Sequence, residues 1–202
     1  AVGTVARHES RELAGSGIAD GRIASLGDVS AAQGKENIDA TGLTILPGVI
    51  DTQVHFREPG IEHKEDLQSG SLAAVMGGVT GVFEMPNTKP PTTTPEAVRD
   101  KVARATDRMH CDFAFYVGGT HENAAELPEL EKMAGVCGVK VFMGSSTGNL
   151  LVPDDDGVAD ILRFIGRRAA FHSEDEFRLR ERRELAETGK VETHPVWRDA
   201  EA

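Results

Sequence analysis

The chain has 202 residues, which is long enough to form one large domain or two small ones around a buried core. Its formal net charge is −11 and its lysines and arginines form no cluster, which argues against a nucleic-acid backbone or an anionic membrane as the main partner. No apolar run approaches the roughly 18 residues of a membrane span, and the first residues lack the apolar core of a signal peptide. We therefore expect a cytoplasmic protein.

The first 46 residues are rich in glycine, alanine and serine, and they contain short apolar pieces that alternate and then turn, as in residues 21–27. This texture predicts a few short strands of a small β module, which we expect to occupy residues 1–46. The two cysteines, Cys111 and Cys137, lie far from each other in apolar stretches outside any CxxC pair. We expect both to be reduced core residues and not a disulfide.

From Leu43 onward the sequence changes to apolar runs that are too dense for a sheet with one solvated face, which predicts strands buried on both faces. These runs are residues 43–51, 79–85, 112–117, 138–143 and 169–172. The strand starts follow one another about 30 residues apart, the length of a βα unit. Such repeats build either an open doubly wound sheet or a closed (β/α) barrel, and the spacing alone leaves both open.

Segments with helical signals lie between the predicted strands. One carries apolar residues at helical spacing: Val158, Ile161, Leu162 and Ile165. Thr94 followed by Pro95 is typical of an N-cap with proline in the first turn, and Gly189 predicts the end of another helix.

Polar residues of unusual chemistry follow four of the five predicted strands. They are Gln53, His55 and Arg57 after the first strand, Asn87 after the second, Lys140 within the fourth, and His172 at the end of the fifth. In parallel α/β folds ligands bind at the carboxyl ends of the strands, so these residues would share one rim. An ammonium group inside an apolar strand is costly unless it is neutralised, paired or modified. Independent structural roles would not favour one rim, so the joint placement favours a functional site.

Each residue alone also has a structural interpretation. A single histidine at a strand end is more often hydrogen-bonded than a ligand, and a buried lysine usually has a carboxylate partner. Arg57 and Glu58 would serve equally as a loop ion pair, and Asn87 as an Asx turn. The remaining histidines lie in predicted loops or helix starts, where we expect structural roles: His8, His63, His110, His121 and His194.

Several segments resemble the amidohydrolase superfamily and, within it, the dihydroorotases of the long-chain bacterial class. The matching segments are VHFREPG at 54–60, EDLQSGSLAAVMGGVT at 65–80, MPNT at 85–88, VKVFMGSS at 139–146 and FHSED at 171–175. Residues 18–48 also resemble the family's N-terminal β-sandwich where it leads into the barrel. The resemblance implies a partial (β/α)8 TIM-type barrel of about five βα units over residues 47–202, preceded by part of a β-sandwich.

The same resemblance implies a zinc-dependent hydrolase that interconverts N-carbamoyl-L-aspartate and dihydroorotate in pyrimidine biosynthesis, with one or two zinc ions. By position, His55 would bind the first metal, a carboxylated Lys140 would bridge both, and His172 would bind the second. Arg57 and Asn87 would hold the substrate carboxylate. Burial that lowers the pKa of Lys140 would favour this chemistry, because a carbamate forms only on a neutral amine.

Two features depart from the family pattern. Gln53 stands where a first-strand histidine is usual, and an amide is a poorer zinc ligand than imidazole, so its role as a ligand is doubtful. The chain begins with alanine and ends before the family's sixth-strand histidine and eighth-strand aspartate. We therefore expect a fragment that is inactive in isolation, with its first and fifth barrel strands left as unpaired edges.

Two alternative functions stay open. One is a hydantoinase- or allantoinase-type cyclic amidase, against which Arg57 and Asn87 argue. The other is a non-catalytic homologue that supports an aspartate transcarbamoylase, for which Gln53 is the best indication and against which Lys140 and His172 argue. Whether the protein is a dihydroorotase or another cyclic amidase, we expect it to act on a small-molecule substrate and to form a homo-oligomer.

Overall fold

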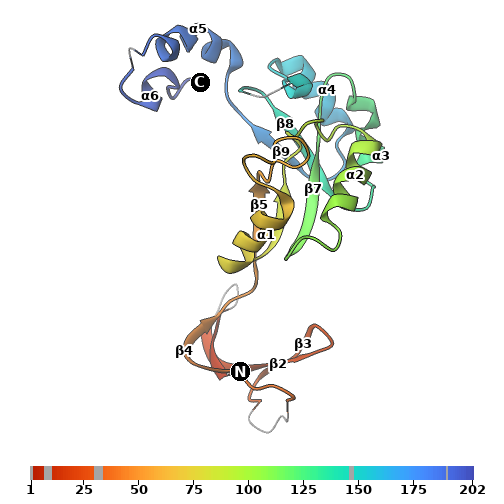
Figure 1. Ribbon diagram of the computed structural model, residues 1–202, viewed down its shortest axis with the longest axis vertical. Helices are drawn as coiled ribbons and strands as arrows, with labels where there is room; N and C mark the ends of the chain where they lie inside the picture. Colours follow the sequence, from red (N-terminus) through yellow and green to blue (C-terminus); the bar gives the residue numbers. More distant parts are fainter. Residues whose placement is uncertain (1, 7–10, 30–33, 146–147, 190) are drawn as a thin grey trace. The chain divides into compact units, whose positions relative to one another are not determined.

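The computed structural model describes residues 2–6, 11–29, 34–145, 148–189 and 191–202 (Figure 1). The chain divides into two compact units, Ala1–Val49 and Ile50–Ala202. No helix in the described ranges combines the length and the apolar character needed to cross a membrane. Cys111 and Cys137 are both free thiols, and burial raises the pKa of Cys137 to about 12.

The first unit contains a four-stranded sheet in the order β3-β2-β1-β4. Its strands are β1 (Val2–Ala6), β2 (Arg11–Ala19), β3 (Arg22–Gly27) and β4 (Asp39–Ile45). β2 and β3 form a hairpin whose two turn residues, Asp20 and Gly21, have φ angles of 52° and 71°, as the tight Asp-Gly turn requires. The short strands expected from the sequence are therefore present, although Leu13 and Ile18 are 81% and 73% exposed.

The second unit is built on a five-stranded sheet in the order β5-β6-β7-β8-β9. Its strands are β5 (Val49–Val54), β6 (Val79–Glu84), β7 (Asp112–Gly118), β8 (Val136–Phe142) and β9 (Ala169–His172). The pairings from β6 to β9 are parallel, and strands adjacent in the chain are adjacent in the sheet. This arrangement is that of consecutive βα units, and it confirms the predicted α/β class.

Helices connect the strands, and several begin where the sequence places a capping residue. They are α1 (Leu67–Met76), α2 (Pro95–Ala105), α3 (Leu127–Leu130), α4 (Asp155–Phe164), α5 (Glu176–Glu187) and α6 (His194–Trp197), with 3-10 turns at Ala124–Glu126 and Gly148–Leu150. The Thr94 hydroxyl accepts the Ala97 amide at 3.3 Å, which confirms the predicted cap of α2. Gly189 follows α5 with a left-handed φ of 63°, as expected of a helix end.

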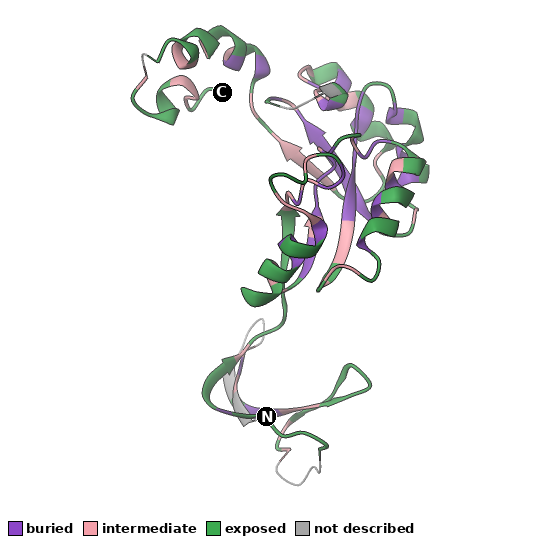
Figure 2. Cartoon of the chain, viewed as in Figure 1, coloured by how far each residue is buried: buried purple, intermediate pink, exposed green. Residues whose placement is uncertain are grey.

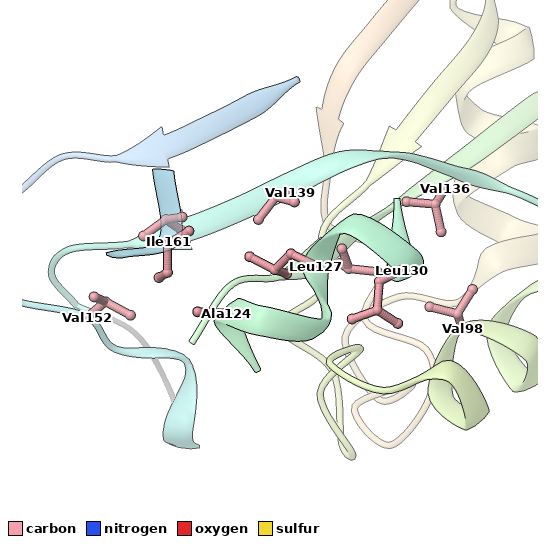
Figure 3. Packing of buried hydrophobic residues seen from close by; sticks show 10 residues of the cluster. Val98, Ala124, Leu127, Leu130, Val136, Val139, Val152 and Ile161 are labelled. Atoms are coloured by element: carbon pink, nitrogen blue, oxygen red, sulfur yellow. The ribbon is translucent and has the colours of Figure 1, made fainter. Parts of the chain in front are cut away.

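The largest apolar core lies between the central strands and the helices. Figure 3 shows Leu127 and Leu130 of α3 packed near Val136 and Val139 of β8, with Ile161 of α4 in the same cluster. Every residue of β8 is buried. The helical spacing in α4 is confirmed in part, because Ile161 is fully buried while Leu162 is 49% exposed.

The expectation that every strand is buried on both faces is wrong for β5. All of its residues are exposed except the half-buried Val54, whereas β8 is an interior strand of the sheet and is covered (Figure 2). β5 and β9 are the two edges of the sheet, so each pairs with one strand only. This edge position agrees with the unpaired first and fifth barrel strands expected from the sequence.

Candidate metal and substrate site

The predicted site residues lie at the carboxyl ends of parallel strands, and so on one rim of the second unit. His55 directly follows β5, Asn87 lies three residues after β6, and His172 is the last residue of β9. Lys140 of β8 pairs in register with Gly118 of β7 and Ala170 of β9. The shared rim comes from the parallel pairing alone, which brings together residues up to 117 positions apart in the sequence.

His55 and Asn87 are in direct contact across the first two strands. The Nδ1 atom of His55 lies 2.9 Å from the Oδ1 atom of Asn87. Because the amide oxygen only accepts, Nδ1 carries the proton and Nε2 is left with the lone pair that a metal ligand needs. Burial lowers the pKa of His55, and the positive charge of Arg57 lowers it further. The neutral, ligating form of the ring is therefore favoured.

Lys140 is buried without a polar partner. Lys140 is 1% exposed, and its Nζ atom makes no hydrogen bond to any described residue. The Nζ atom lies over the ring of Phe142, 4.9 Å from its centroid. Burial lowers the pKa of the amine, because no anion in contact offsets the loss of water. The usual structural interpretation, a buried lysine paired with a carboxylate, does not apply within the described residues.

His172 is oriented by a carboxylate. Its Nε2 atom contacts the Glu174 carboxylate, and its ring stacks on Phe142 with 6.1 Å between ring centroids. Arg198 donates to the same carboxylate at 3.1 Å. A carboxylate on one ring nitrogen is the arrangement that commonly orients a metal-binding histidine, and it leaves Nδ1 as the other donor atom. Sequence reasoning missed Glu174, although FHSED places it two residues after His172.

The loop after β5 is held by a buried carboxylate. Glu58, 4% exposed, accepts the Leu67 amide at 3.1 Å and two hydrogen bonds from the Arg108 guanidinium at 2.7 and 3.2 Å. The alternative of an Arg57–Glu58 loop ion pair is thus not what the structure shows, because the ion-pair partners described for Glu58 are Arg104 and Arg108. Arg57 has a left-handed φ of 67°, which is uncommon and costly for a residue with a side chain.

Other histidines and Gln53 contribute less to the rim. Gln53 is exposed on β5, and its backbone amide donates to the Asp51 carboxylate at 2.9 Å. His121 lies 3.3 Å from Asp154, and His194 packs against Trp197. His63 and His110 are exposed, and His8 lies outside the described residues. No group of three or more histidine, cysteine, aspartate or glutamate side chains gathers as a metal site within the described ranges.

Comparison with known proteins identifies the family. The sequence model described as "Dihydro-orotase-like" matches residues 42–147. An allantoinase of Rubrobacter xylanophilus is 41% identical over 169 residues, which is 83% of this chain and 36% of the relative. A dihydroorotase of Methanosarcina mazei is 38% identical over 163 residues, which is 79% of this chain and 35% of the relative. The chain thus spans about a third of the length of these two relatives.

The fold comparison agrees. The solved structure of an L-hydantoinase (dihydropyrimidinase) from Arthrobacter aurescens superposes with a TM-score of 0.77 at 26% identity, covering 96% of this chain and 46% of that one. This agreement over nearly the whole chain confirms the predicted partial barrel with its preceding β module. Since the family model covers more than half of the residues, the chain belongs to the dihydro-orotase-like family of cyclic amidohydrolases.

Proposed function

We propose that the intact protein interconverts dihydroorotate and N-carbamoyl-L-aspartate, the dihydroorotase reaction of pyrimidine biosynthesis. The observation that carries this proposal is the unpartnered Lys140 amine, buried at the rim that also holds His55 and His172. A buried amine with no partner lowers the stability of the folded protein. A bound ligand or a covalent modification that interacts with the amine would offset this loss. Names of relatives support the reaction class, because they include dihydroorotase, allantoinase and L-hydantoinase.

The donor set fits a metal such as zinc, with one or two ions. His55 offers Nε2, His172 offers Nδ1, and a carboxylated Lys140 would offer an anionic oxygen pair. The lowered pKa of Lys140 favours the neutral amine, which attacks CO2 and loses a proton to give the carbamate. Zinc, when bound, lowers the pKa of water and polarises a carbonyl group. The exposed Gln53 adds little to this set.

Arg57 and Asn87 suit the carboxylate of the substrate. A guanidinium group donates two parallel hydrogen bonds to the two oxygens of a carboxylate. A neutral hydantoin ring has no carboxylate to accept this pair of hydrogen bonds. Asn87 uses its oxygen for His55, so its amide hydrogens remain available as donors. One side chain would thus orient both a metal ligand and the substrate, which couples binding to the reacting centre.

A second candidate is an allantoinase or hydantoinase activity. The allantoinase of Rubrobacter xylanophilus is slightly more identical to this chain than the dihydroorotase of Methanosarcina mazei, 41% against 38%. Purified intact protein assayed with dihydroorotate, hydantoin and allantoin separates the two candidates. We expect turnover of dihydroorotate to exceed that of the neutral rings, and preferential turnover of allantoin or hydantoin would refute the proposal.

Metal analysis and peptide mass spectrometry test the site itself. We expect at least one zinc equivalent per chain and a CO2 adduct on the peptide that contains Lys140. A metal-free protein with an unmodified Lys140 amine and no turnover would instead favour a non-catalytic partner of aspartate transcarbamoylase. That alternative is supported by Gln53, which stands where the family usually has a histidine. The cytoplasmic location, the homo-oligomeric state and any aspartate transcarbamoylase partner remain predictions from the sequence.

A further inference from the structure

A buried ion pair joins the end of β6 to helix α2, close to the ends of β5 and β6 that carry His55 and Asn87. Glu84 is the last residue of β6 and is 1% exposed, and Lys101 of α2 is fully buried. The Lys101 ammonium contacts the Glu84 carboxylate and lies 5.2 Å from the centroid of the Phe115 ring. Neither residue belongs to the predicted site, and a buried ion pair is by itself weak evidence of a contribution to stability.

The pair joins the two segments that carry the site. Burial raises the pKa of Glu84, while the Lys101 ammonium and the backbone amides of Arg57 and Phe56, which directly follow His55, favour its ionised form. The Lys101 ammonium donates to the carbonyl of Met85 at 2.8 Å, two residues before Asn87. The Met85 amide also donates to the Val54 carbonyl at 3.0 Å, which joins the same two segments.

We propose that Glu84 and Lys101 are positioning residues that hold His55, Arg57 and Asn87 in their working arrangement. Glu84 fixes the backbone on the His55 side, Lys101 fixes the backbone on the Asn87 side, and the contact between the two charges sets the distance between the segments. This inference rests on the proposed function for the meaning of the site, while the geometry it concerns is measurable without turnover.

The backbone of Arg57 explains why a charged acceptor is needed there. Its left-handed φ of 67° persists only where the surroundings hold it. A carboxylate that accepts two successive amides is a strong acceptor for such a turn, because hydrogen bonds to an ionised group are about twice as strong as neutral ones. An apolar pair of the same volume would fill the space between β6 and α2 but would leave both amides without an acceptor.

The decisive variant replaces both charges together. Glu84→Met with Lys101→Met removes the pair but keeps its volume, and such a replacement of a buried ion pair is often neutral or stabilising. Glu84→Gln is the single variant, which retains an oxygen acceptor but loses the charge. Glu131→Gln is the matched control, because Glu131 is also 2% exposed and accepts two successive amides, Gly166 at 2.8 Å and Arg167 at 3.2 Å, in the loop that precedes β9.

The first readout is the amide proton shift of Arg57 and Phe56 in NMR spectra of the intact protein. We expect the double variant to remain folded, to move both amide signals upfield, and to change the ring signals of His55. Glu131→Gln should move the signals of Gly166 and Arg167 and leave those of Phe56, Arg57 and His55 in place. Unchanged Arg57 and His55 signals in the folded double variant would overturn the proposal.

The second readout is the kinetics with dihydroorotate. For the double variant we expect kcat/KM to fall about 10- to 100-fold, as for other groups that orient catalytic ligands, and for Glu131→Gln to keep the native value. An equal loss in both variants would mean a general structural role and would refute positioning. If the native protein fails to turn over dihydroorotate, the proposed function fails, and the NMR comparison still decides whether the pair positions the rim.

Discussion

Glu58 gives a stability prediction whose size follows from its contacts. Replacing it by alanine leaves the Leu67 amide, at the buried start of α1, without its acceptor at 3.1 Å, which costs about 1–3 kcal/mol. The interaction of the carboxylate with the helix N-terminus adds about 0.3–1 kcal/mol. The Arg108 side chain is 39% exposed, so its ion pair contributes at most about 1 kcal/mol. We therefore expect Glu58→Ala to lower the free energy of unfolding by about 1–5 kcal/mol.

Urea denaturation followed by far-UV circular dichroism measures this loss. Glu129→Ala is the control, because Glu129 also pairs with a cation, Lys132, but the two side chains are 80% and 67% exposed. The control should stay within about 0.5 kcal/mol of the native protein. A Glu58→Ala variant as stable as that control would show that the Leu67 and Arg108 hydrogen bonds do not hold the loop, and the reasoning would be wrong.

Four further outcomes are expected. Lys140→Met should abolish the CO2 adduct and reduce bound zinc, as peptide mass spectrometry and metal analysis would show, while native metal content would contradict the ligand role. Arg57→Lys should raise KM for dihydroorotate about tenfold or more, since a lysine cannot donate the same forked pair, and an unchanged KM would remove Arg57 from the carboxylate site. Ile161→Ala should lower the free energy of unfolding by about 2–5 kcal/mol in urea titrations, because Ile161 is fully buried in the main cluster. The isolated 202-residue chain should show no metal-dependent turnover of dihydroorotate, and detectable turnover would refute this expectation.

The strands and their order were predictable because apolar runs and their spacing are local properties of the sequence. The predicted runs that begin at Val79, Asp112 and Ala169 coincide with the observed starts of β6, β7 and β9, and β8 begins two residues before the predicted Gly138. Exposure was less predictable: β5 reads as an apolar run, yet its burial depends on what lies beyond the sheet edge. Apolar composition indicates a strand, but it does not indicate how many neighbours that strand has.

The sequence predicted which residue types lie at the ends of the strands, but it did not predict the contacts between their side chains. Residues with distinctive chemistry, such as His55 and Lys140, are visible in the sequence. Their partners are not, because Glu84 and Lys101 lie 17 residues apart at no motif spacing and are ordinary charged residues in the sequence. Pairing of this kind depends on how α2 packs against β6, which periodicity does not specify. The Asn87 contact with His55 was missed for the same reason.

Buried charges in the second unit separate into two kinds, and the difference indicates which residues perform chemistry. Glu58 accepts a backbone amide, Lys101 donates to a backbone carbonyl, and Glu84 contacts the Lys101 ammonium, so the burial of these charges fixes the positions of loops. Lys140 has no such partner within the described residues. Because an unpaired buried polar group lowers stability, a protein that keeps one needs a compensating ligand or modification. The paired charges therefore define the framework of the rim, and the unpaired amine marks the position at which we expect the metal-bridging group.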